Sequence, residues 1–386
     1  MSGAGRADVY LYGAPASLYT AKVRAFLRAR GVPFEERFPS HPDYRARVRP
    51  AVESHRIPAV EFPDGLILQD SAVILDELER RYPDPSAAAM GPRQILLTRL
   101  MEVVGDRGLA KPAMHFRWNF LPVNEGFVVG EFGRSLGFPA PAEEIERLGQ
   151  RIASKMASYL PMLGITERTI PVIERAYGES LSLLNTHFSA HPYLLGGAPS
   201  RGDYALMGPL YGHLGRDPYP LQLMQRTAPL VFRWTERING GERATPEFSN
   251  RPRELLADDA APPTLVAWLR HLFAGFSDDL VLSAERMNAW FDANPDAPPG
   301  SWVSAEGADQ PALGEIVVNY HGVATPQQAL GHTLWLLQRP LDWVEGLSGA
   351  ARVVAEDLMR EIGAGALLNI RLRRRLTRMR GRLAVA

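Results

Sequence analysis

The stretch RIPAVEFPDGLILQDSAVI, which runs from Arg56 to Ile74, predicts a β-hairpin followed by a helix. Two short apolar segments, Ala59–Phe62 and Leu66–Gln69, are joined by Pro63-Asp64-Gly65. This tripeptide favours a tight turn, because proline fixes one backbone angle and glycine accepts a positive φ. Beyond it, apolar side chains recur at helical spacing at Ile74, Leu75, Leu78 and Tyr82. Ser71 is expected to cap this helix, beside Asp70.

The residues before this stretch predict a strand, a helix and a second strand. Val9–Tyr12 is the first strand, and Gly13-Ala14-Pro15 ends it. A helical pattern begins at Leu18 and stops at Gly31, a residue suited to the left-handed turn after a helix. Phe34–Phe38 is the second strand, so the two strands should pair in parallel. With a further helix over Pro42–Val52, the predicted order is βαβ-α-ββα.

This pattern resembles the thioredoxin-like domain of the glutathione S-transferase superfamily. The pair Ile57-Pro58, followed by a hairpin and an acidic-Ser helix start, is similar to the second half of that domain, in which the proline is cis. The segment GAPASLYTAKV, Gly13 to Val23, resembles the start of the serine-type members, where Gly-x-Pro-x-Ser precedes a basic residue and Val. HPYLLGGAPSRGDYAL, His191 to Leu206, is similar to the C-terminal signature, a capping box formed by Ser200 and Asp203. The resemblance runs from about Val9 to about Asn239.

The resemblance implies that glutathione is a co-substrate and indicates which residues hold it. Ser17 would activate the glutathione thiol at the start of the first helix, where the positive helix end also stabilises a thiolate. Asp106 would reach the γ-glutamyl amine of glutathione bound to a partner subunit. The full set implied for glutathione binding is Arg56, Ile57, Pro58, Asp70, Ser71 and Asp106. The set implied for a pocket that holds an electrophile is Tyr19, Met114, His115 and Trp118.

Several of these assignments have alternatives that the sequence leaves open. Ser17 can be a plain helix cap, and Tyr12 or Tyr19 can be the activating residue, since tyrosine-type members exist. His115 is better explained as a structural histidine than as a base, and the aromatic side chains near it fit a core as well as a pocket. His187 and His191 are four residues apart, but no third ligand is evident, so a metal site is rejected.

Composition limits the function further. Lys plus Arg and Asp plus Glu number 43 each, so no overall field favours nucleic acid or an acidic membrane as a partner. The chain has no cysteine, which excludes disulfides and any mechanism that uses a thiol of the protein itself. There is no apolar stretch long enough for a membrane span and no signal-peptide pattern at the N-terminus. These features favour a cytoplasmic protein.

With 386 residues, two or three domains are expected. We predict a thioredoxin-like glutathione-binding domain over residues 1–85, a helical domain over 93–240, and a mostly helical extension over 241–386 that packs on the core. Residues 241–263 read as a linker. In the extension we expect helices at Leu265–Phe276, Val281–Phe291, Gln327–Leu337 and Ala351–Leu368, and a strand at Leu313–Val323. Seven arginines between Arg371 and Arg382 indicate a helix end or a solvated basic face.

Three functional hypotheses follow. The first is a homodimeric glutathione transferase, with a role in detoxification, whose thiolate attacks a small hydrophobic electrophile; conjugation, dehalogenation, ether cleavage and isomerisation remain open as reaction types. The second is a non-catalytic protein of the same fold that binds glutathione or another ligand, which the unfamiliar extension favours. The third and weakest is a scaffold whose basic tail meets an anionic surface.

Overall fold

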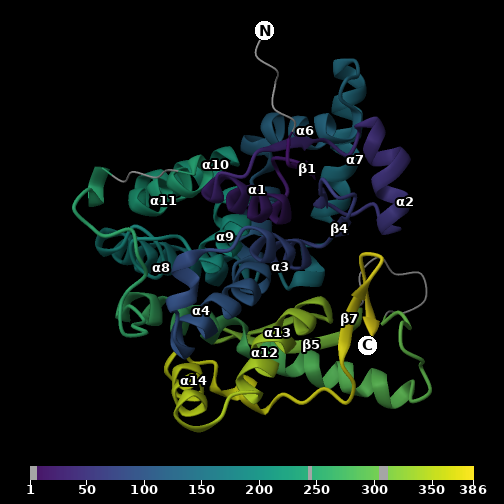
Figure 1. Cartoon of the computed structure of the whole chain (residues 1–386). Coiled ribbons are helices and arrows are strands. Elements are labelled where there is room, and N and C mark those ends of the chain that lie inside the picture. Colours follow the sequence, from purple (N-terminus) through teal and green to yellow (C-terminus); the bar gives the residue numbers. More distant parts are fainter. Residues whose placement is uncertain (1–6, 242–245, 304–311) are drawn as a thin grey trace.

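The computed structural model describes residues 7–241, 246–303 and 312–386 (Figure 1). Its N-terminal part has the predicted thioredoxin-like fold, a single mixed sheet with helices on it. The strands run in the order β2-β1-β3-β4; β1 and β2 are parallel, and the other neighbours are antiparallel. The elements are β1 (Val9–Tyr12), α1 (Leu18–Arg30), β2 (Phe34–Arg37), a π-helical turn (Tyr44–Val48) continued by α2 (Arg49–Val52), β3 (Ala59–Glu61), β4 (Ile67–Gln69) and α3 (Ser71–Arg81).

Local sequence signals account for the turns of this domain. Gly65 has φ +84° in the predicted turn, and the N–H of Phe62 bonds the carbonyl of Leu66 across it at 2.9 Å. Gly31 ends α1 with φ +65°, as expected. The predicted cap of α3 was wrong by one residue. Asp70 is the N-cap, because its carboxylate accepts the N–H of Ala72, and Ser71 is the first helical residue.

A helical domain follows the thioredoxin-like part. Its α9 begins at the predicted capping box, where Asp203 accepts the N–H of Ser200 at 2.8 Å. The helix α1 packs against α9 and α11, which joins the two parts. The helices are α4 (Pro92–Val103), which continues into a π-helical turn (Val104–Gly108), α5 (Ala110–Trp118), α6 (Leu121–Gly137), α7 (Ala142–Ala157), α8 (Ile170–Ala190), α9 (Arg201–Met207), which continues as a π-helical segment (Gly208–His213), α10 (Pro218–Thr227) and α11 (Pro229–Gly240).

The extension is mostly helical, as predicted, but several of its elements differ from the expectation. A single long helix, α12, replaces two predicted ones, and residues 323–330 form a strand where a helix was expected at Gln327. The chain ends in a hairpin that the sequence pattern did not indicate. The elements are α12 (Pro263–Ala293), β5 (Ala312–Tyr320), β6 (Val323–Leu330), α13 (His332–Glu345), α14 (Gly349–Glu361), β7 (Leu376–Met379) and β8 (Arg382–Val385). Within the described residues, no helix is long and apolar enough to cross a lipid bilayer.

The extension shares one hydrophobic core with the rest of the molecule. In Figure 1 it lies along α3 and α4, and the contacts confirm that α13 and α14 both pack on α4. Trp268, Leu272 and Phe276 of α12 are buried in the same apolar cluster as side chains of the helical domain. A buried ion pair between Arg107 and Asp279 crosses this contact. The extension therefore packs as an integral part of the molecule.

The arginine-rich tail does not end a helix. It forms the segment before β7 and the β7–β8 hairpin, where ion pairs with Asp292, Asp342, Asp70 and Glu53 offset four of the seven charges. Arg373, Arg375 and Arg380 are exposed, in agreement with a solvated basic face. Most of the positive charge that the third hypothesis would use for an anionic surface is thus paired within the chain.

Candidate functional site

Ser17 lies where α1 begins, in a loop that the helical domain holds in place. Its Oγ accepts the N–H of Thr20 at 3.2 Å, so Ser17 is the N-cap of α1 and its own O–H remains available to donate. Arg117, which is buried, donates to the carbonyl of Ala16 at 3.1 Å and pairs with Asp217 at 2.6 Å. Arg117 therefore fixes the position of Ser17, a role that the sequence pattern did not reveal.

The Ile57–Pro58 bond is cis. Ladder pairing of β3 begins at Ala59, so the main chain of Ile57 is not used by the sheet and stays available next to the start of α3. Ile57 and Arg56 are both half-buried. The carbonyl of Arg56 accepts the Tyr44 hydroxyl at 3.5 Å, which helps to hold this segment on the sheet.

Asp70 makes two side-chain contacts at the start of α3 and has an unusual backbone conformation. One oxygen of its carboxylate accepts the N–H of Ala72 at 2.9 Å, and the other accepts Nε of Arg378 at 3.2 Å. Its backbone has φ +85°, a region that residues other than glycine rarely occupy and that clusters at functional sites. Asp70 is only 8% exposed, because the C-terminal hairpin lies over it. Ser71 beside it is also buried.

Asp106 faces the same region and finds its partners within one chain. One oxygen accepts the hydroxyl of Tyr19 and the other that of Thr333, both at 2.8 Å. Nε2 of His332 lies 3.8 Å from the carboxylate. Desolvation lowers the pKa of His332, although Asp106 opposes the shift. The predicted reach of Asp106 into another subunit is therefore not required for it to lie at the site.

The two tyrosines considered as alternatives to Ser17 are both engaged elsewhere. Desolvation and then the Asp106 carboxylate raise the pKa of Tyr19 well above its ordinary value, although the side chain as a whole is 37% exposed. Tyr12 is fully buried in a separate cluster with Tyr44, and its hydroxyl donates to Glu61 at 3.0 Å. Burial raises the pKa of Tyr12 to about 12. Neither hydroxyl is as free to donate as that of Ser17.

The residues proposed for the electrophile pocket do not all lie on one surface. His115 is 1% exposed and bonds Glu174 at 3.0 Å and Asn119 at 2.7 Å, inside the helical domain. Trp118 is buried in an apolar cluster, which Met114 joins from a half-buried position. Tyr19 lies at the site, because its hydroxyl donates to Asp106. His115 and Trp118 therefore contribute to the core of the helical domain.

The structure thus brings Tyr19, Asp70 and Asp106 together and adds three residues from the extension. The charges near His332 are those of Asp106, Arg378, Asp70 and Arg56, so these groups form one electrostatic cluster. His332, Thr333 and Arg378 were missed as site residues. The arginine-rich tail was the available signal for Arg378, but nothing in the sequence indicated which of its arginines would reach Asp70. Among the described residues, no three His, Asp or Glu side chains are placed to hold a metal ion.

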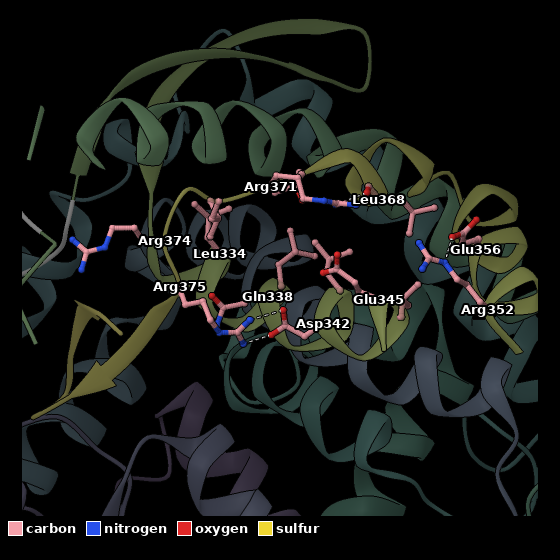
Figure 2. A pocket seen from close by; sticks show the side chains of 15 residues that line it. Leu334, Gln338, Asp342, Glu345, Arg352, Glu356, Leu368, Arg371, Arg374 and Arg375 are labelled. Atoms are coloured by element: carbon pink, nitrogen blue, oxygen red, sulfur yellow. Dashed lines mark hydrogen bonds and ion pairs between the residues drawn. The ribbon is translucent and has the colours of Figure 1, made fainter. Parts of the chain in front are cut away.

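A hollow lies in the extension, between α13, α14 and the segment before β7 (Figure 2). Its volume of about 170 Å³ is below the roughly 300–1,000 Å³ of most small-molecule sites. Its rim charges pair with one another, since Arg375 bonds Asp342 and Arg352 bonds Glu356 at 2.9 Å. This hollow is therefore not the candidate site.

Asp70→Asn is expected to weaken glutathione binding about tenfold, and to lower the melting temperature because the buried guanidinium of Arg378 loses its charged partner. Asparagine keeps an oxygen for the N–H of Ala72 and tolerates the positive φ, so only the charge and its charge-assisted bonds are lost. Calorimetric titration with glutathione measures the affinity. Asp64→Asn, a change at an exposed turn carboxylate, is the control. Equal affinities for the wild type and Asp70→Asn would remove Asp70 from the site.

Comparison with known proteins agrees with the geometry. Residues 11–86 match the family model of the glutathione S-transferase N-terminal domain. No curated protein matches the chain. Similar solved structures include a glutathione S-transferase from Rhodospirillum rubrum F11 (16% identity, 67% of this chain and 99% of that one, TM-score 0.36) and the β-etherase LigF from Sphingobium sp. strain SYK-6 (20% identity, 62% and 96%, TM-score 0.37). Another, from Methylobacterium radiotolerans, is a complex with glutathione sulfonate (19% identity, 66% and 99%, TM-score 0.36).

Proposed function

We propose that this chain binds glutathione at its N-terminal domain, where residues 11–86 match the family model of the glutathione S-transferase N-terminal domain, and activates the thiol for attack on a small hydrophobic electrophile. The observation that supports this best is the set of groups near the starts of α1 and α3. These are the hydroxyl of Ser17 at the N-terminus of α1, which donates to no described residue, the main chain of Ile57 before a cis proline, and the N-cap carboxylate of Asp70, whose backbone has a positive φ.

Each part of glutathione has a counterpart among these groups. The main chain of Ile57, between Arg56 and Pro58, would pair with the cysteinyl unit, since it takes no part in the β3 ladder. Asp70 and Asp106 offer carboxylates for the γ-glutamyl ammonium, and Ser71 lies in the first turn of α3, where free N–H groups favour an anion. Ser17 would meet the sulfur at the start of α1.

Ser17 and the positive end of α1 would supply the chemistry by stabilising the thiolate. A free thiol with a pKa near 8.5 is only a few per cent ionised at pH 7, and the thiolate is the nucleophile. A hydrogen bond from Ser17 to the charged sulfur contributes about 1.5–3 kcal/mol, which lowers the thiol pKa by roughly one to two units. The electrophile would approach past Tyr19, whose hydroxyl contacts Asp106. Conjugation, dehalogenation, ether cleavage and isomerisation all share this thiolate step.

A second candidate function is a binding protein that uses the same site without catalysis. The observation that favours it is the cover over the site, since Asp70 is paired with Arg378 and Asp106 with Thr333. A covered site can hold a ligand while it limits the approach of a second substrate.

Two assays distinguish these functions. Calorimetric titration with glutathione is expected to show one site per chain, and thiol consumption with a panel of aryl halides, epoxides and aryl ethers is expected to exceed the uncatalysed rate. Binding without thiol consumption on any of these electrophiles would favour the binding protein. A titration without heat change at millimolar glutathione would contradict both functions.

Assembly and location remain predictions. The resemblance predicts a homodimer. Asp106 does not support this prediction, because it contacts Tyr19 and Thr333 of its own chain. Light scattering at micromolar concentration measures the assembly. The predicted cytoplasmic location and the role in detoxification likewise belong to the proposal.

A further inference from the structure

The C-terminal hairpin reaches both sides of the proposed glutathione site. Arg378 on β7 bonds Asp70 at the start of α3, and Arg380 at the tip pairs with Glu53 at 3.0 Å, before the cis proline. Gly381 at the tip has φ +70° and packs so closely that a Cβ there would overlap Oγ of Ser54. The hairpin therefore lies across the site, and Figure 1 shows β7 beneath β4 in this position.

The base of this hairpin is fixed in the core of the extension. Leu376, Leu383 and Val385 are at most 2% exposed. The N–H of Leu376 donates to Oε1 of Gln338 at 2.9 Å, and the main chain of β8 bonds Ser301 and Val303 at 2.9 and 3.0 Å. Because these side chains are buried and both strands are hydrogen-bonded to neighbouring segments, the position of the hairpin does not depend on the contacts at its tip. The hairpin therefore forms one fixed side of the site.

Arg378 is held so that part of its guanidinium stays unused. The side chain is 9% exposed and lies over the ring of Trp335, with 5.8 Å from its central carbon to the ring centre. Its Nε bonds Asp70, and the two terminal nitrogens make no hydrogen bond to any described residue. A guanidinium fixed in this way presents two parallel N–H donors, the geometry that binds a carboxylate bidentately.

We infer that Arg378 binds the α-carboxylate of the γ-glutamyl group of glutathione, while the neighbouring carboxylate of Asp70 holds its ammonium. This inference rests on the proposed function and extends it, because it makes the extension a part of the glutathione site. The γ-glutamyl end carries one positive and one negative charge on the same carbon. Arg378 and Asp70 offer the complementary pair at adjacent positions, although 308 residues separate them in sequence.

The test compares glutathione with an analogue in which 4-aminobutyryl replaces the γ-glutamyl unit, so that the α-carboxylate alone is missing. Arg378→Ala is expected to weaken glutathione binding about 10- to 100-fold, and to change binding of the analogue less than twofold. Arg378→Lys, which keeps the charge but not the planar fork, is expected to fall between. The matched control on the same hairpin is Arg380→Asn, since asparagine tolerates the φ of +51° at this exposed position, and it should bind both ligands like the wild type.

Each other outcome overturns the inference in a distinguishable way. Equal losses for glutathione and the analogue would show that Arg378 acts only by positioning Asp70. Tighter binding of glutathione by Arg378→Ala would show that the hairpin excludes the ligand. Unchanged binding, with a melting temperature equal to that of the wild type, would remove Arg378 from the site while leaving the proposed function intact. A wild type that binds neither ligand would overturn the proposed function and this inference together.

Discussion

Ser17→Ala is expected to raise the thiol pKa of bound glutathione by roughly one to two units and to lower turnover about 10- to 100-fold. The dissociation constant of glutathione should change severalfold at most, because the main chain of Ile57 and the carboxylate of Asp70 hold the tripeptide. The pKa is read from the ultraviolet absorbance of the thiolate as a function of pH. The substitution also removes the side-chain cap of α1, at a cost of about 1 kcal/mol, so the melting temperature should fall slightly.

Tyr19→Phe and Tyr12→Phe are the controls for this experiment. Both hydroxyls already donate to carboxylates, so their removal should leave the thiol pKa unchanged. A shift in Tyr19→Phe without one in Ser17→Ala would make Tyr19 the activating residue. No shift in any of the three variants would favour the non-catalytic binding protein.

Asp279→Ala is expected to destabilise the protein by about 3–5 kcal/mol, because it leaves the guanidinium of Arg107 buried without its charge partner. The two side chains are only 6% and 5% exposed, and a loss of this size is a large part of the usual 5–15 kcal/mol of stability. Chemical unfolding followed by tryptophan fluorescence measures the change. The double variant Arg107→Met/Asp279→Leu should recover most of the loss, because it removes both charges together.

The matched control lies in the same extension. Glu356 pairs with Arg352 at the surface, where water screens the charges, so Glu356→Ala should cost less than about 1 kcal/mol. If Asp279→Ala were as mild as Glu356→Ala, the extension would not share a core with the helical domain and would instead fold as an independent unit.

The thioredoxin-like domain could be predicted because its signals are local. Three of these signals act within a few residues and set the boundary of an element: the Pro-Asp-Gly turn, the glycine after α1 and the carboxylate before α3. Ser71 and Asp70 are both good N-cap residues, so their residue types do not decide which of them caps α3. What decided between them is the backbone at Asp70, whose positive φ has no signature in the sequence.

The extension was harder to predict because its polar residues have partners far along the chain. The predicted break between the helices at Leu265–Phe276 and Val281–Phe291 is absent, because Asp279 lies inside one helix and pairs with Arg107. Gln327 was placed on a helix, although the pairing with β5 makes it part of a strand. The contact between Arg378 and Asp70 spans most of the chain, and a single sequence holds no information about such a pair.

The most direct test of the account is the structure of the full chain crystallised with glutathione. We expect the sulfur within hydrogen-bonding distance of Oγ of Ser17, the cysteinyl unit paired with the main chain of Ile57, and the γ-glutamyl end between Asp70 and Arg378 with the hairpin in place. A sulfur beside Tyr19, or glutathione bound only where the C-terminal hairpin has left the site, would contradict it.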